Sequence, residues 1–200
     1  MVLWWCVDTL ERVMTTRITG GTHRGRKVRS RKGPGLRPTL ELVRAAIYSM
    51  VGDTVVVGGR VLDLYAGTGS LGMEALSRGA SYVDFVESNN SRCRDIKDSL
   101  KDFGFAQHGS VHSGRVERVL NRLTPGYRLV LAAPPYDDDP WLELMNILCD
   151  NDILAAGGVV VADHRRSLEL ADSYSYLFRE RKRRYGDTAV SIYKAGVGCG

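Results

Sequence analysis

The sequence predicts an α/β protein whose central sheet is doubly wound and mostly parallel. Three observations carry this prediction. From Arg60 onward, short apolar runs alternate with stretches of helical periodicity, which is the pattern of repeated βα units. The run at 129–132 is apolar throughout, as expected of a strand buried on both faces. A glycine-rich turn at 67–72 follows the first strand, at the position where such sheets bind ligands.

Length and composition favour one domain and exclude several classes of protein. The 200 residues are 44% hydrophobic, which is enough for one sizeable core. The sequence contains no apolar run of the roughly 18 residues needed to cross a membrane. The four cysteines and four histidines have no metal-ligand spacing, so we expect no metal and free thiols in a reducing cytoplasm.

We divide the chain into four parts. Residues 1–15 are expected to be a disordered or mis-annotated leader, with translation starting at Met1 or Met14, because their apolar run is short and carries acidic residues. Residues 16–56 are expected to form a basic N-terminal extension and a helix. The main domain is placed at 57–195, and 196–200 is a tail.

The segment from Arg17 to Arg37, called the basic arm below, contains no acidic residue. Its glycines predict a short hairpin or extended arm. A charge run is usually a solvated face, but this density of arginine favours binding of nucleic-acid phosphates. The candidate phosphate-binding residues are Arg17, Arg24, Arg26, Lys27, Arg29, Arg31, Lys32 and Arg37.

The elements after the basic arm are assigned from periodicity and from helix-end signals. Thr39 is predicted to cap a helix whose apolar stripe is Leu42, Val43, Ala46, Ile47 and Met50. We then expect strands at 61–65, 82–86, around 110–112, 129–132 and 159–162, helices at 70–78, 90–103, near 116–123 and at 141–149, and a closing hairpin of 174–184 with 188–193.

The turn Gly67-x-Gly69-x-x-Gly72 matches the dinucleotide-binding fingerprint, and Glu87 follows at the distance expected of a ribose ligand. Asp63 argues against a dinucleotide, because a pyrophosphate would have to approach its carboxylate. A cationic amino-acid group would be attracted there instead, as in S-adenosylmethionine. The chain also has no second domain to hold a hydride acceptor, and a Pro-Pro-Tyr sequence ends the fourth strand. S-adenosylmethionine is therefore favoured, with a nicotinamide oxidoreductase as a minor alternative.

Several segments together resemble the ribosomal RNA guanine-N2 methyltransferases that act on the small subunit. The matching segments are Thr16–Gly21, Leu36-Arg37-Pro38-Thr39 with Val43-Arg44, Val61–Gly79, Phe85-Val86-Glu87 and Tyr185-Gly186-Asp187-Thr188. The similarity extends from about Thr16 to Tyr193. It implies a class I methyltransferase fold with a seven-stranded, Rossmann-like sheet and an RNA-contacting N-terminal extension. The partner implied is small-subunit ribosomal RNA or the 30S particle, and we expect a cytoplasmic monomer without a membrane association.

The resemblance also implies the site residues. Asp63 and Gly67 would contact the methionine moiety of S-adenosylmethionine and Glu87 its ribose. The other positions assigned to the cofactor are Thr39, Tyr65, Ala66, Thr68, Gly69, Leu71, Gly72 and Ser88. The catalytic motif falls on Ala133, Pro134, Pro135 and Tyr136.

The sequence departs from the family pattern at two positions. Amine methyltransferases of this kind carry Asp or Asn where this chain has Ala133. That side-chain oxygen, with the following backbone carbonyl, accepts the hydrogens of the exocyclic amine while the aromatic residue stacks on the flipped base. Arg115 stands near the position where many class I enzymes accept a hydrogen bond from adenine, and a guanidinium cannot accept one.

Three acidic residues follow Tyr136 directly, and one of them could supply the missing oxygen. We favour the alternative that Asp137, Asp138 and Asp139 form an exposed loop that caps the following helix.

The leading hypothesis is a methyltransferase acting on the N2 amine of a guanine in 16S ribosomal RNA. A catalytically weakened RNA-binding homologue is the second hypothesis, because of Ala133. Amine methylation of DNA adenine or cytosine is the third.

Overall fold

The computed structural model describes residues 13–31, 39–136 and 138–196. The predicted leader lies almost wholly outside the described residues. So do Lys32, Arg37 and Asp137, and most of the predicted tail.

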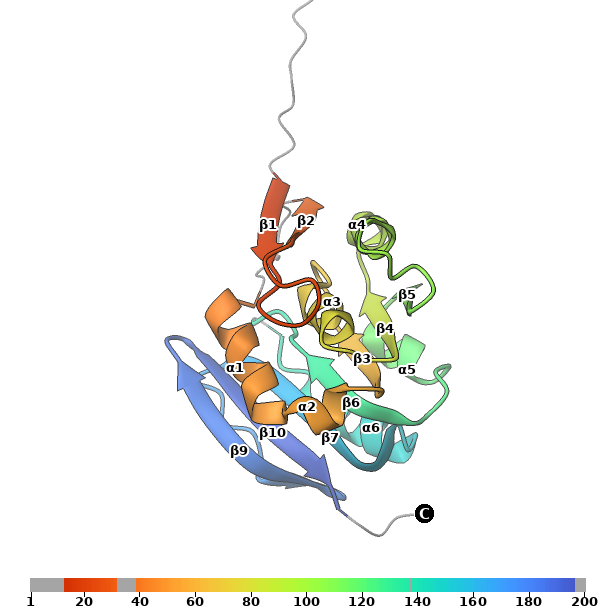
Figure 1. Ribbon diagram of the computed structural model, residues 1–200. Helices are drawn as coiled ribbons and strands as arrows, with labels where there is room; N and C mark the ends of the chain where they lie inside the picture. Colours follow the sequence, from red (N-terminus) through yellow and green to blue (C-terminus); the bar gives the residue numbers. More distant parts are fainter. Residues whose placement is uncertain (1–12, 32–38, 137, 197–200) are drawn as a thin grey trace, which may run out of the picture.

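Eight strands form one sheet in the order β5-β4-β3-β6-β7-β10-β9-β8 (Figure 1). The strands β3 to β7 pair in parallel, and β10 joins β7 and β9 in antiparallel fashion. Their bounds are β3 Arg60–Leu64, β4 Tyr82–Glu87, β5 Gly109–Ser113, β6 Tyr127–Ala132, β7 Leu154–Arg165, β8 Ser173–Tyr174, β9 Leu177–Tyr185 and β10 Thr188–Ala195. Seven of these strands correspond to the predicted ones, and the two-residue β8 adds an eighth at the edge.

Helices cover both faces of the sheet. One face packs against α1 Glu41–Val51, α2 Asp53–Val56, α3 Ser70–Ser77 and α4 Asn90–Asp102. The other face packs against α5 Val116–Leu120 and α6 Trp141–Asp150. The strands alternate between the two cores: Val61 and Leu129 face the first, whereas Leu62 and Val130 face the second. The doubly wound α/β prediction is confirmed.

For α1, the predicted Thr39 cap is wrong, and the predicted apolar stripe is right at Val43 and Ile47 but wrong at Leu42. The N-cap of this helix is Leu40 without a side-chain hydrogen bond, and Thr39 Oγ1 instead donates to Asp163 Oδ2 at 3.0 Å. Leu42 is 72% exposed, whereas Arg44 is fully buried. The buried stripe is shifted because Arg44 finds an acidic partner inside the protein, which apolar periodicity does not reveal.

The N-terminal residues form an antiparallel hairpin of β1 Val13–Arg17 and β2 Lys27–Arg31. The hairpin lies beside α3 and α4 (Figure 1). Ile18 and Val28 are each 1% exposed and belong to the first core. The hairpin is therefore packed onto the domain through a few apolar residues.

Candidate functional site

A cavity of about 810 Å³ opens at the carboxyl ends of the parallel strands. Its lining comes from the residues that follow β3, β4, β5, β6 and from the end of β7, together with Thr39 and Leu40 before α1. A cavity of this size suits a ligand of nucleoside dimensions. Its position agrees with the rule that open parallel sheets bind ligands beyond the ends of their strands.

The turn after β3 has an unusual backbone. Gly67 and Gly69 have φ angles of 56° and 71°, which favour glycine. Tyr65, with a φ of 56°, adopts the same left-handed region without being glycine. A Cβ added at Gly72 would lie 2.3 Å from Phe85 Cε1, so the third glycine is required by close packing of α3 on β4.

Asp63 is 1% exposed and lies behind this turn rather than in the cavity lining. Its Oδ2 accepts a hydrogen bond from the Gly72 backbone N–H at 2.8 Å. The pKa of Asp63 is raised to about 8, chiefly by burial; the Gly72 hydrogen bond opposes this rise and the nearby Glu87 charge adds to it. In this structure Asp63 holds the turn against α3, so a contact with the methionine moiety would be indirect or would need a rearrangement.

Glu87 ends β4 and lines the cavity while remaining 5% exposed. Its two carboxylate oxygens accept from the backbone N–H groups of Gly67 and Asn89, both at 2.8 Å. Arg92 lies 3.8 Å from the same carboxylate. The carboxylate therefore joins the turn after β3 to the start of α4.

The residues assigned to the cofactor separate into two groups. Those that line the cavity are Thr39, Tyr65, Gly67, Glu87 and Ser88. Those that lie outside the lining are Asp63, Ala66, Thr68, Gly69, Leu71 and Gly72. The residues of the second group lie in β3, in the glycine turn and in the first helical turn of α3, where they shape the backbone. The sequence motif therefore includes residues that do not line the cavity.

The end of β5 adds a third wall, formed by Gly114, Arg115 and Val116. The Arg115 side chain is 76% exposed and lies 3.6 Å from Glu117. Glu117 Oε1 also accepts from the Tyr65 hydroxyl at 3.4 Å. Burial, followed by the Glu117 charge, raises the pKa of Tyr65.

The four residues of the predicted catalytic motif all line the cavity. Ala133 packs on the first core, Pro134 is buried and Pro135 is exposed. The Tyr136 hydroxyl lies 2.6 Å from Thr188 Oγ1 and donates to Asp163 Oδ1 at 3.4 Å. One edge of the aromatic ring is thereby fixed to β7 and β10.

Asp163 and Thr188 line the cavity but were not predicted as site residues. Asp163 is 6% exposed and accepts from both Thr39 and Tyr136. The signal for Asp163 was present in the sequence: an acid follows the apolar run of β7, as Glu87 ends that of β4. Asp138 and Asp139 are exposed, as predicted, and also line the cavity, but the N-cap of α6 is Pro140 without a side-chain hydrogen bond. The predicted cap is therefore wrong.

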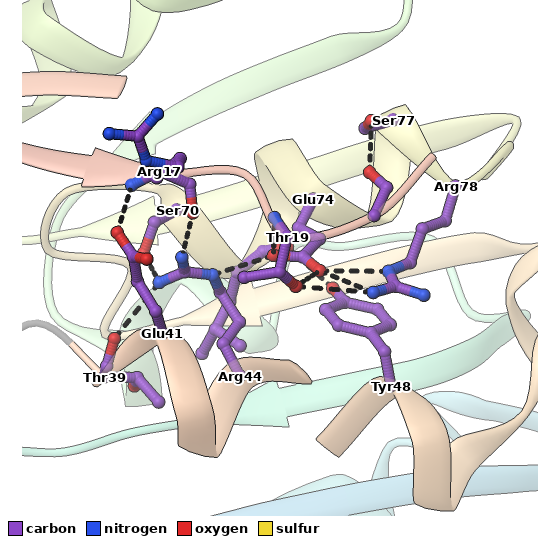
Figure 2. Close-up of polar contacts among 12 residues, drawn as sticks. Arg17, Thr19, Thr39, Glu41, Arg44, Tyr48, Ser70, Glu74, Ser77 and Arg78 are labelled. Atoms are coloured by element: carbon purple, nitrogen blue, oxygen red, sulfur yellow. Dashed lines mark hydrogen bonds and ion pairs between the residues drawn. The ribbon is translucent and has the colours of Figure 1, made fainter. Parts of the chain in front are cut away.

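A buried polar cluster connects the cavity wall to the basic arm (Figure 2). Glu74 of α3 accepts from Arg44 Nε at 2.8 Å, from Arg78 Nη2 at 2.7 Å and from the Thr19 backbone N–H at 3.2 Å. Arg44 also donates to the backbone carbonyls of Arg17 and Thr39. One guanidinium thus holds the end of β1 and the residue that contacts Asp163.

The described residues of the basic arm differ in their surroundings. Arg26 Nη2 donates to the Asp102 carbonyl at 2.8 Å and its guanidinium lies 4.1 Å from the Phe103 ring centre. Arg31 pairs with Asp95 at 3.4 Å. The other members within the described part of the arm are exposed: Arg17, Arg24, Lys27 and Arg29. Two of the predicted phosphate-binding residues therefore also anchor the hairpin to α4.

Among the described residues, no group of three or more His, Cys, Asp or Glu side chains is arranged to hold a metal ion. No helix in the same part of the chain is long and apolar enough to cross a membrane. Cys93 and Cys149 are buried free thiols.

Comparison with known proteins gives consistent matches over nearly the whole chain. Residues 16–194 match the family described as conserved hypothetical protein 95. YlbH of Bacillus subtilis (strain 168), provisionally named an rRNA methyltransferase, is 35% identical over 181 residues, covering 89% of this chain and 98% of YlbH. Ribosomal RNA small subunit methyltransferase D of Escherichia coli (strain K12) is 29% identical over 178 residues, covering 89% of each chain. The structure of the Escherichia coli protein yhhF, provisionally titled a methyltransferase, superposes with a TM-score of 0.80 at 27% identity, covering 92% of this chain and 100% of that one.

Proposed function

This chain belongs to the family described as conserved hypothetical protein 95, and we propose that it is an S-adenosylmethionine-dependent methyltransferase of ribosomal RNA. YlbH and the Escherichia coli methyltransferase D, which carry rRNA methyltransferase names, match it over 98% and 89% of their own lengths. The finer proposal is that it methylates the N2 amine of a guanine in 16S RNA, in the cytoplasm and as a monomer.

The observation that carries the proposal is that residues assigned to the cofactor and residues assigned to the target base line the same cavity. The carboxylate of Glu87, the backbone around Gly67 and the Pro134–Tyr136 segment all line this cavity. A carboxylate beside a turn backbone suits ribose hydroxyls and an amino-acid group. The residues present therefore fit S-adenosylmethionine, and Gly114 and Val116 would line the part of the cavity that holds its adenine.

When bound, S-adenosylmethionine would supply a methyl group on a sulfonium: the amine nitrogen would form the new N–C bond as the S–C bond breaks, the sulfur would keep the electron pair, and the amine proton would pass to solvent. The residues of this chain orient the amine. The Pro134 carbonyl accepts one amine hydrogen, and the Tyr136 ring, fixed through its hydroxyl, stacks on the base. The low exposure of the Glu87 and Asp163 carboxylates favours a site shielded from water.

The exposed basic residues of the arm would hold RNA phosphates near the mouth of the cavity. Arg24, Lys27 and Arg29 lie on the hairpin, and Arg44 couples that hairpin to Thr39 at the cavity wall. Phosphate contacts of this kind position a substrate without reading its sequence.

Methyl transfer to three substrates tests the proposal. Purified protein and tritiated S-adenosylmethionine are incubated with undermethylated 30S particles, with free 16S RNA and with duplex DNA, and the products are digested for nucleoside mass spectrometry. We expect N2-methylguanosine from one of the two RNA substrates. Methyladenine or methylcytosine in DNA would establish the alternative substrate class, and binding of S-adenosylmethionine without transfer to any substrate would establish the weakened homologue.

A further inference from the structure

The acid missing at Ala133 has a structural counterpart on the neighbouring strand. The strands β6 and β7 pair in parallel with Leu131 beside Val161 and Ala132 beside Ala162. One residue further along, Ala133 and Asp163 continue these two strands. Neighbouring strands lie about 4.8 Å apart, so side chains at paired positions are neighbours on the same face. The Asp163 carboxylate is therefore attached one strand away from Ala133, the position that lacks an acidic side chain.

Both residues face the same side of the sheet. Ala133 packs against the first core, together with Leu131 and Val161, and Asp163 follows Val161 at the two-residue period of a strand. Both also line the cavity. Asp163 thus presents its carboxylate on the wall that holds the Pro134 carbonyl and Tyr136.

Two hydroxyl groups donate to the Asp163 carboxylate. Thr39 Oγ1 donates to Oδ2 at 3.0 Å, and the Tyr136 hydroxyl donates to Oδ1 at 3.4 Å. A carboxylate offers about four lone-pair sites, so it can accept an amine hydrogen in addition to such hydroxyls. The side chain is 6% exposed, which strengthens a hydrogen bond made there.

We propose that Asp163 is the catalytic acceptor that replaces the absent motif side chain, and that it binds the exocyclic amine of the target base together with the Pro134 carbonyl. This inference rests on the proposed function, because it concerns a substrate bearing a conjugated amine. It also explains how a chain with Ala133 orients such an amine with two acceptors. Asp138 and Asp139 are weaker candidates because both are exposed.

The test is a rescue experiment on 30S particles. Asp163→Ala is expected to lower kcat by about a hundred- to a thousandfold, as for removal of one preorganised hydrogen-bonding group. Asp163→Asn should lose less activity, because an amide oxygen still accepts. The double variant Ala133→Asp/Asp163→Ala should recover at least about tenfold over Asp163→Ala, because the acceptor returns on the adjacent strand. Affinity for S-adenosylmethionine, measured by calorimetry, should stay within about twofold in all variants, which also reports that they are folded.

The outcomes separate this inference from the proposed function. If the wild-type protein transfers methyl groups but Ala133→Asp fails to rescue Asp163→Ala, Asp163 only positions Tyr136 and the inference is overturned. A loss of activity in Asp138→Ala that Asp163→Ala does not show would overturn it as well. If neither the wild-type protein nor Ala133→Asp transfers methyl groups to RNA, the proposed function itself fails.

Discussion

Arg44 Nε lies 2.8 Å from Glu74 Oε2, and both side chains are fully buried between α1 and α3. The same two residues hold the backbone of Thr19 and Arg17 from the arm. A buried ion pair at this place links the helix before the domain, the helix that follows the glycine turn and the hairpin. We regard it as the element that fixes the N-terminal extension to the domain (Figure 2).

Replacing Glu74 by Gln should therefore destabilise the protein strongly. The Arg44 charge would remain buried without its counter-charge, which typically costs about 3–5 kcal/mol of unfolding free energy. Urea denaturation measures this change. Glu180→Gln is the control, because its pair with Lys194 spans 3.8 Å with both side chains about half exposed and should cost less than about 1 kcal/mol. Equal losses of stability in the two variants would contradict the assigned role of the pair.

Gly72→Ala should destabilise the fold and weaken cofactor binding together. The new methyl group would meet Phe85 at 2.3 Å, and forcing apart a packed helix and strand costs about 1–3 kcal/mol. Because Gly72 N–H binds Asp63, the glycine turn would move with the helix. Thermal unfolding and calorimetry measure both effects. Gly104→Ala has open space and only an unfavourable φ of 76°, so it should leave the affinity for S-adenosylmethionine unchanged.

Asp63 should make the stability of the protein fall as pH rises. Its pKa is about 8 in the folded protein and near 3.8 in the unfolded chain, so between these values the folded state binds the extra proton. The free energy of unfolding contributed by this group is therefore greatest below pH 4 and decreases towards pH 8. Asp63→Asn keeps an oxygen for Gly72 N–H and should flatten this dependence in urea titrations from pH 5 to 8. An unchanged slope would show that Asp63 ionises normally.

The exposed basic residues of the hairpin should contribute to RNA affinity but not to cofactor affinity. We expect Lys27→Ala/Arg29→Ala to weaken binding of 16S RNA and to reduce the slope of log K against log salt by about 1.4, because each phosphate that is no longer neutralised reduces it by about 0.7. Arg118→Ala/Arg122→Ala is the matched control, because it removes two exposed charges from the region of α5, on the opposite face of the sheet. A similar weakening of RNA binding in the control would mean that only net charge matters.

The order of strands and helices could be predicted because each apolar run has the period of its element. Arg44 was not identified as buried, because its partner lies 30 residues away and periodicity treats every arginine as exposed. The glycine turn and the Pro-Pro-Tyr wall were predicted from local motifs. Asp163 was missed although an acid after the apolar run of β7 marks the position, because its role depends on the register of β7 beside β6.

The cofactor motif also shows what spacing alone cannot resolve. The sequence groups Asp63 with Glu87 as two acids near the glycines. In the folded chain Glu87 lines the cavity, whereas Asp63 lies behind the turn and binds Gly72. The two acids differ because their side chains point in different directions from their strands. The direction of Asp63 depends on how α3 packs against the sheet.

Calorimetric titration of the purified protein with S-adenosylmethionine tests the central claim most directly. We predict one binding site per chain, with an affinity reduced at least about tenfold in Glu87→Ala because the carboxylate that suits the ribose hydroxyls is removed. Wild-type protein that releases no binding heat at millimolar S-adenosylmethionine, or a Glu87→Ala variant that binds as tightly as the wild type, would contradict the assignment of this cavity.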